Sequence, residues 1–336
     1  MAKALITDAA GLLLSADERA FFRDADPWGF IIFRRNVETP DQLRALTDSM
    51  RESVGREAPI LVDQEGGRVQ RLGPPHWPKY PPGAVYGAAY ERDEKAGLRA
   101  AWLGARLIAH DLHAVGIDVD CLPLADVPVS EADPVIGNRA YGTTPAKVAA
   151  IAAAVAEGLI AGGVLPVLKH IPGHGRATAD SHHALPVVAT DRATLQSTDF
   201  AAFVPLAKLP LGMTAHVVFT AIDPVAPATT SVTMVQQVIR GHIGFDGLLM
   251  SDDISMNALS GTLAERARAS LAAGCDIVLH CNGSFAGRRE VADACPPLAG
   301  DAKRRADAAL AMRHAPAPFD VAAAREEFAA MNAGVA

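Results

Sequence analysis

The sequence predicts an α/β fold, a single-domain (β/α)8 barrel with added helices at its C-terminal end. Eight short apolar runs recur along the chain, and longer segments of helical character separate them. The runs are continuously hydrophobic rather than alternating, as expected for parallel strands that are buried on both faces. The segments between them can hold crossover helices. A length of 336 residues also suits one barrel, because α/β barrels often fold as single domains of this size.

The candidate strands follow one another through most of the chain. In order, they are ALITD (4–8), GFIIF (29–33), PILVD (59–63), IDVDCLPL (117–124), VLPVLKH (164–170), LGMTAHVV (211–218), GLLMSD (247–252) and DIVLHC (276–281). Alternation of eight strands with helices favours a closed TIM barrel, and an open doubly wound sheet is the alternative.

The segments between the runs carry helix-start signals. Ser15 and Glu18 form a capping-box pattern, and Thr39 and Thr144 each place a cap residue before a proline. Proline suits the first helical turn, where its missing N–H costs nothing. Residues 148–163 are rich in alanine and end in glycine just before the fifth run, as a helix with a C-terminal glycine cap does.

The domain organisation predicted from these patterns is one unit over residues 1–336. The barrel is expected to span roughly residues 1–300, and C-terminal helices residues 301–336, around the proline break HAPAPFD. The stretch RLGPPHWPKYPPG (71–83) is too rich in proline and glycine for regular structure. We interpret it as an excursion after the third strand and not as a linker.

Composition excludes several classes of protein. Half of the residues are hydrophobic and 21% are charged, so intrinsic disorder is excluded. The formal net charge is −7 and no basic run follows a phosphate backbone, so nucleic acid is not an expected partner.

Localisation signals are also missing from the sequence. No run reaches the roughly 18 apolar residues needed to cross a bilayer, and the N-terminus lacks the apolar core of an export signal. We therefore expect a cytoplasmic protein with no membrane partner. The cysteines show no CxxC spacing, which favours a reducing compartment without disulfides or a zinc site; they are Cys121, Cys275, Cys281 and Cys295.

Polar residues stand where six of the apolar runs end. In a parallel barrel these ends open onto one face, where functional residues gather. A single acidic residue there is often a helix cap, and a single histidine is often a core residue. Six such positions together favour a functional site; they are Asp63, Asp126, Lys169–His170, His216, Asp252–Asp253, and His280 with Asn282.

Asp63 opens the segment DQEGGRVQRL, in which Gly66–Gly67 permits a tight turn before Arg68 and Arg71. A carboxylate beside an arginine suits the binding of vicinal sugar hydroxyls, because one group accepts and the other donates hydrogen bonds. A surface salt bridge is the alternative for this pair.

The segment KHIPGHGRATADSHHALP (169–186) is too polar and irregular for a helix and predicts a catalytic loop. Asp180 and His182 are two residues apart, so the carboxylate can orient the imidazole and raise its proton affinity. His182 is therefore a candidate general acid and base. Zinc is the rival interpretation, although the spacing matches no common zinc site.

Several motifs together resemble the β-N-acetylglucosaminidase branch of glycoside hydrolase family 3. They are LVDQEGGRVQRL, IGNRAYG, KHIPGHG followed by TADSH, MTAH, and GLLMSDDISM. The resemblance implies Asp252, and not Asp253, as the nucleophile, and Asp180 with His182 as the acid/base dyad. It implies a sugar-binding set made of Asp63, Arg71, Arg139, Lys169 and His170. IGNRAYG departs from the family pattern at Asn138 and Ala140, which affects the contacts expected around Arg139.

The resemblance also implies a reaction. A retaining double displacement would remove β-1,4-linked N-acetylglucosamine from 1,6-anhydro-N-acetylmuramic acid, with or without peptide, in peptidoglycan recycling. We expect no cofactor and no metal, a small-molecule carbohydrate as the partner, and a monomer. Three alternatives stay open: a glycoside phosphorylase, metal-dependent hydrolysis by the histidine-rich loop, and a non-catalytic barrel that binds muropeptides.

Overall fold

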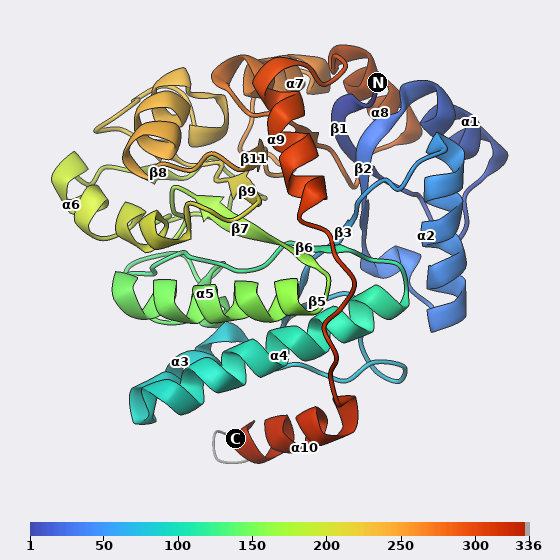
Figure 1. The fold of residues 1–336 in the computed structure, drawn as a ribbon. Helices are drawn as coiled ribbons and strands as arrows, with labels where there is room; N and C mark the ends of the chain where they lie inside the picture. Colours follow the sequence, from blue (N-terminus) through green and yellow to red (C-terminus); the bar gives the residue numbers. More distant parts are fainter. Residues whose placement is uncertain (333–336) are drawn as a thin grey trace.

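The computed structural model describes residues 1–332 and contains a closed parallel barrel (Figure 1). Its eight strands lie in the order β11-β9-β7-β6-β3-β2-β1-β12. A parallel bridge between Met250 and Ile277 joins the two ends of this order. The strands are β1 (Lys3–Asp8), β2 (Pro27–Ile32), β3 (Ile60–Val62), β6 (Val119–Asp120), β7 (Leu165–Ile171), β9 (Leu211–Thr214), β11 (Leu248–Met250) and β12 (Val278–Leu279). Each of the eight apolar runs overlaps one of these strands, so the barrel prediction is confirmed.

One predicted strand is divided in two. The run 211–218 forms β9, which ends at Thr214, and then β10 (Val218–Phe219), which pairs with β8 (Val187–Val188) outside the barrel. The chain leaves the barrel at His216, whose ring bonds to Thr229 and to the backbone of Asp253. A further small antiparallel pair, β4 (Gln64–Gly66) and β5 (Val69–Gln70), follows β3.

Helices surround the barrel and cover its outer face (Figure 1). They are α1 (Ala16–Ala25), α2 (Pro40–Val54), α3 (Gly83–Arg92), α4 (Glu94–Ala114), α5 (Pro145–Ala161), α6 (Arg192–Ser197), a π-helical segment (Met234–His242), α7 (Leu263–Ala273) and α8 (Phe285–Ala294). Short 3-10 turns occupy Arg34–Asn36, Gly137–Arg139, Phe200–Ala202, Val204–Leu206 and Ala228–Thr230. Residues 71–82 form neither helix nor strand, as predicted for the proline-rich excursion.

All three predicted cap residues stand at the N-cap of a helix, and two of them make a side-chain capping hydrogen bond. Ser15 makes a full capping box with Glu18, and the Thr39 side chain accepts a bond from the backbone of Gln42. Thr144 is the N-cap residue of α5, as predicted, but its side chain makes no capping hydrogen bond. Pro145 still occupies the first turn of α5, where it has no N–H to be capped.

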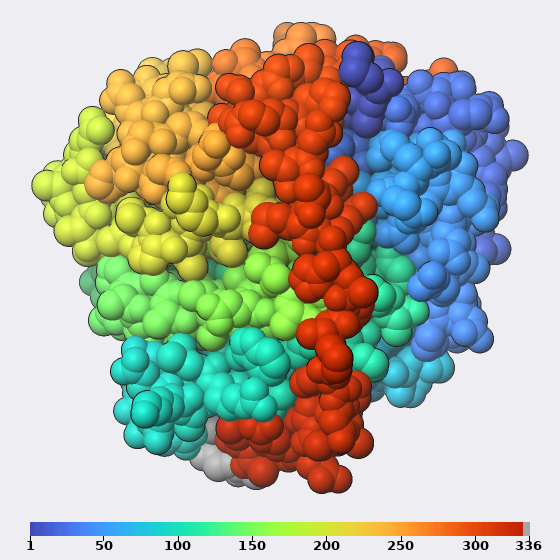
Figure 2. Space-filling model, in the orientation of Figure 1, coloured from blue at the N-terminus to red at the C-terminus, as the bar shows by residue number. Residues whose placement is uncertain are grey.

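The C-terminal helices pack against the barrel in two places. Helix α9 (Gly300–Ala311) lies across the N-terminal end of the barrel, where Ala306 and Ala309 join the core formed by side chains inside the strands. The chain then crosses the surface to α10 (Val321–Asn332), which packs on α4 (Figure 2). Arg99 on α4 and Glu327 on α10 form a two-bond ion pair at 2.8 Å.

Candidate active site

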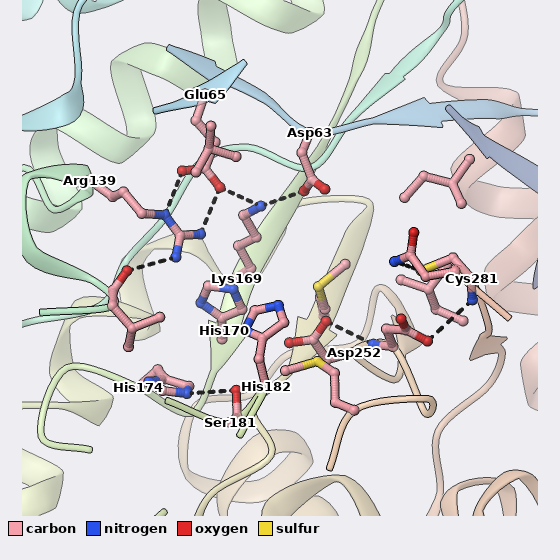
Figure 3. Close-up of a pocket in the computed structure, with 18 of the residues that line it drawn as sticks. Asp63, Glu65, Arg139, Lys169, His170, His174, Ser181, His182, Asp252 and Cys281 are labelled. Carbon is pink, nitrogen blue, oxygen red and sulfur yellow. Dashed lines mark hydrogen bonds and ion pairs between the residues drawn. The ribbon is translucent and has the colours of Figure 1, made fainter. Parts of the chain in front are cut away.

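The carboxyl ends of the barrel strands surround a pocket of about 150 Å³ (Figure 3). The side chains that line it come from segments distant in sequence, as the strand-end pattern predicted. Those with acidic or basic side chains are Asp63, Glu65, Arg71, Arg139, Lys169, His170, His174, His182, Asp252 and Asp253. Seven of the eight predicted site residues are in this group. The eighth, Asp180, does not line the pocket but forms a hydrogen bond with His182.

One wall of the pocket is a chain of ion pairs. Lys169 Nζ lies 2.9 Å from Asp63 Oδ1 and 2.7 Å from Glu65 Oε1. Arg71 Nη2 donates to the other oxygen of Asp63 at 3.0 Å. Arg139 donates two bonds to Glu65, both at 2.8 Å. The arrangement excludes the surface salt bridge considered for Asp63 and Arg71, since both line the pocket.

Electrostatics keep this wall charged at neutral pH. Burial alone would raise the pKa of Asp63 and Glu65, but Lys169 outweighs it, helped by Arg71 beside Asp63 and Arg139 beside Glu65. Both pKa values therefore lie below their ordinary range. Burial would lower the pKa of Lys169, yet its two carboxylate partners hold that pKa above the usual value. Fixed donors and acceptors side by side suit the hydroxyl groups of a sugar.

Asp252 lies on another side of the same pocket (Figure 3). One of its oxygens accepts a hydrogen bond of 2.8 Å from the backbone N–H of Asp253. Burial opposes ionisation, but the nearby imidazoles of His216 and His170 and this N–H outweigh it and lower the pKa of the carboxyl. Asp252 is therefore an anionic carboxylate at neutral pH, the state that a nucleophile requires.

Asp253 also lines the pocket, although neighbouring side chains in a strand point to opposite faces. Side chains alternate only within a strand, and β11 ends at Met250. The Asp253 carboxylate is engaged in structural bonds: it accepts from the backbone and hydroxyl of Ser255 at 3.0 and 2.6 Å, and from the backbone of Cys281 at 3.2 Å.

His182 lies on the loop after β7, which we call the histidine loop (residues 172–186). Its ring Nδ1 is 2.7 Å from Asp180 Oδ1, and its backbone N–H donates to the same oxygen at 2.9 Å. Burial raises the pKa of Asp180, but the bonds to His182 outweigh it and lower that pKa. With Nδ1–H directed at the carboxylate, Nε2 is left to exchange a proton in the pocket. The contact between Asp180 and His182 that their spacing predicted is therefore present.

Sequence reasoning assigned no role to several residues of this site. Glu65 stands two residues after Asp63, a spacing that could have indicated it. Asp126 was noted at a strand end, and it fixes His170 at 2.7 Å and the backbone of His174 at 2.7 Å. His174 in turn contacts Ser181 on the histidine loop at 3.2 Å. Asp126, His174 and Ser181 come together only in the folded chain.

Two general properties concern metals and membranes. Within residues 1–332, no group of three or more His, Cys, Asp or Glu side chains is arranged to hold a metal ion. No helix in that range is both long and apolar enough to span a bilayer. All four cysteines are buried thiols.

The chain matches the glycosyl hydrolase family 3 N terminal domain over residues 13–296. It belongs to this family and is therefore a glycoside hydrolase. Among its relatives, a beta-hexosaminidase of Chromobacterium violaceum is 39% identical, over 87% of this chain and 82% of its own length. A beta-hexosaminidase of Alkalilimnicola ehrlichii is 40% identical, over 83% and 80% respectively.

Solved structures agree with this assignment. The chain superposes on NagZ from Neisseria gonorrhoeae in complex with N-trifluoroacetyl-D-glucosamine with a TM-score of 0.86 and 33% identity. The match covers 99% of this chain and 97% of that one. Native NagZ from the same bacterium gives a TM-score of 0.87. A single barrel with its C-terminal helices thus accounts for almost all of both chains.

Proposed function

We propose that this enzyme is an exo-acting, retaining β-N-acetylglucosaminidase, with Asp252 as its nucleophile. The observation that carries the proposal is one small pocket lined by an ionised, buried carboxylate, a carboxylate-oriented histidine and a wall of fixed charges. The beta-hexosaminidase names of its relatives, and the N-acetylglucosamine analogue bound by the gonococcal NagZ, support the same activity.

In the first step, Asp252 attacks the anomeric carbon and forms a covalent glycosyl-enzyme. His182 protonates the leaving oxygen as the glycosidic bond breaks. In the second step, neutral His182 takes a proton from water, which attacks the anomeric carbon and releases Asp252. Asp180 holds the imidazole tautomer that both steps need.

The charged wall provides sugar recognition in this mechanism. We assign Asp63, Arg71, Arg139, Lys169 and His170 to the binding of the terminal sugar, with Glu65 holding Arg139 and Lys169 in place. His170 is itself fixed through Asp126. Groups preset in this way lose little freedom when the sugar binds, which favours a tightly oriented complex.

The proposed natural substrate is N-acetylglucosamine β-1,4-linked to 1,6-anhydro-N-acetylmuramic acid, with or without its peptide. The reaction would belong to cytoplasmic peptidoglycan recycling, carried out by a monomer without a metal or cofactor. The similarity to NagZ over nearly the whole chain supports this finer assignment. Comparing kcat/KM for this disaccharide and for chitobiose tests it; a clear preference for chitobiose would contradict it.

The decisive experiment measures turnover of a chromogenic β-N-acetylglucosaminide by the wild type, Asp252→Ala and His182→Ala. We expect Asp252→Ala to lose at least about a thousandfold in kcat, because the covalent route disappears. A fluorosugar should label Asp252, as found by peptide mass spectrometry. A label on Asp253, or none, would overturn the assignment.

The same assay separates the rival functions. Turnover in the presence of phosphate should yield free N-acetylglucosamine, whereas sugar 1-phosphate as the main product would indicate a phosphorylase. Activity should persist in excess chelator, and its loss would indicate metal-dependent hydrolysis. A binding protein without catalysis would show no turnover at all.

A further inference from the structure

The histidine loop is fixed where it begins and exposed where it carries His182. The backbone of Val129 donates to Gly175 O at 3.2 Å, and that of Asp133 donates to Ala177 O at 2.8 Å. Further along, the side chain of His182 is 65% exposed. Residues 173–177 thus form the fixed base of the loop, and the tip that carries His182 projects from it.

Arg176 forms the side-chain attachment of this base. Its Nε donates to Asp199 Oδ2 at 2.6 Å, and its Nη2 donates to Thr198 Oγ1 at 3.0 Å. The Asp199 side chain is only 2% exposed. Its other oxygen, Oδ1, is buried and has no hydrogen-bond partner within residues 1–332. A buried carboxylate with one strong cationic partner binds that partner firmly, because separation would leave the charge uncompensated.

Arg176 does not line the pocket, so it makes no contact with a sugar there. It is four residues before Asp180, on the same loop. Any effect of Arg176 on the reaction must therefore pass through the position of the loop. The sugar-binding wall is held by other segments: Lys169 lies within β7, and Asp63 directly follows β3.

We propose that the ion pair between Arg176 and Asp199 anchors the histidine loop and so sets the position of His182 for proton transfer. The inference rests on the proposed function. Arg176 is a positioning residue: without the pair, the loop tip samples more positions, and fewer of them place Nε2 against the leaving oxygen. Binding of the sugar itself should be unaffected. The planar guanidinium donates to Asp199 and Thr198 in a fixed fork geometry, which the compact ammonium of lysine does not reproduce.

The test compares Arg176→Gln with Arg192→Gln, a matched control on α6 whose side chain is exposed. Two β-N-acetylglucosaminides are used, one with dinitrophenol and one with an alkyl alcohol as leaving group. Only the alkyl alcohol needs protonation by an acid. Values of kcat/KM are compared because they report the glycosylation step for both substrates.

We expect Arg176→Gln to lower kcat/KM about tenfold for the alkyl glycoside and less than about twofold for the dinitrophenyl glycoside. The KM of the alkyl glycoside should change little, and Arg192→Gln should match the wild type on both substrates. Arg176→Lys should lie between Arg176→Gln and the wild type. Asp199→Asn, which breaks the pair from the other side, should reproduce the selectivity of Arg176→Gln. Equal losses on both substrates would overturn the inference.

A double-variant cycle gives the sharpest result. If Arg176 acts through His182, then Arg176→Gln should cause no further loss in a His182→Ala background. A full tenfold loss there would contradict the anchor. The two possible failures are distinguishable. If the loss of kcat/KM in His182→Ala does not depend on the leaving group, His182 is not the general acid, and the anchor proposal is then wrong as well. If the loss in His182→Ala depends on the leaving group but the loss in Arg176→Gln does not, the anchor proposal is wrong and the assignment of His182 stands.

Discussion

Two adjacent aspartates at the end of β11 have different surroundings in the same pocket. Asp252 accepts one backbone hydrogen bond, whereas Asp253 accepts from Ser255 and Cys281 and thereby ties the ends of β11 and β12 together. Chemistry in the sequence could not separate them, and the family resemblance chose Asp252. The hydrogen bonds supply a physical reason for that choice, because an engaged carboxylate is a poorer nucleophile.

Replacement of Asp253 should therefore affect stability more than chemistry. We expect Asp253→Asn to lower the free energy of unfolding by about 1–3 kcal/mol, since charge-assisted bonds to Ser255 and Cys281 are weakened. Denaturant unfolding measures the loss. The fluorosugar should still label Asp252 in this variant. Unchanged stability together with lost labelling would mean that Asp253 takes part in the chemistry.

Glu65 joins Lys169 and Arg139 although it received no role from the sequence. Glu65 and Arg139 are 74 positions apart, so no local spacing could pair them. Glu65→Gln should raise KM more than it lowers kcat, because two cations of the proposed sugar-binding set lose their orientation. It should also destabilise the fold by about 3 kcal/mol, through a buried Lys169 with less compensation. Steady-state kinetics and thermal unfolding test both effects, and a change confined to kcat would contradict this role.

The secondary-structure elements followed closely from local sequence patterns. Continuous apolar runs located every barrel strand, because both faces of each strand are buried. The helix caps at Ser15 and Thr39 were predictable too, because each bonds to a residue only three positions further along the chain. The division of residues 211–218 into β9 and β10 could not be predicted, since the break depends on the contacts of His216 with residues distant in sequence.

The position of α9 leads to a prediction for this element. Ala306 and Ala309 are each 2% exposed against the barrel core, so a larger side chain has no space. We expect Ala306→Leu to cost about 1–3 kcal/mol through overpacking. Ala308→Leu, on the exposed face of the same helix, should stay within about 0.5 kcal/mol of the wild type. Both variants should keep wild-type kcat/KM, because α9 lies at the opposite end of the barrel from the site; equal destabilisation would contradict the packing.

For the molecule as a whole, stability should fall in acid over two pH ranges. Burial, and the neighbouring His170, lower the pKa of His174 to about 4. An unfolded histidine titrates near pH ~6.5, so between about 6.5 and 4 the unfolded state binds a proton that the folded state refuses. This one group should lower the free energy of unfolding by about 3 kcal/mol as the pH falls through this range.

Asp63 and Glu65 act in the lower range. Their folded pKa values are below the ordinary range, so their contribution is present above pH ~4 and is lost as the pH falls further. Urea unfolding at a series of pH values tests the profile. His174→Asn should flatten the upper part and leave the lower part. A stability that stays constant from pH ~6.5 to ~4 in the wild type would contradict the assignment.

The interior of the barrel beneath the pocket is filled by side chains of the strands and of α9. A barrel packed in this way is a core and not a pore, so among residues 1–332 the substrate is expected to enter from the strand-end face alone. In the proposed mechanism the products then leave in a fixed order. The sugar, attached to Asp252, would leave after the aglycone, and water would enter through the space that the aglycone vacates. Free N-acetylglucosamine should consequently be the last product released and should act as a competitive inhibitor. A longer sugar chain is also not expected to pass through the pocket, so only its terminal sugar should be removed.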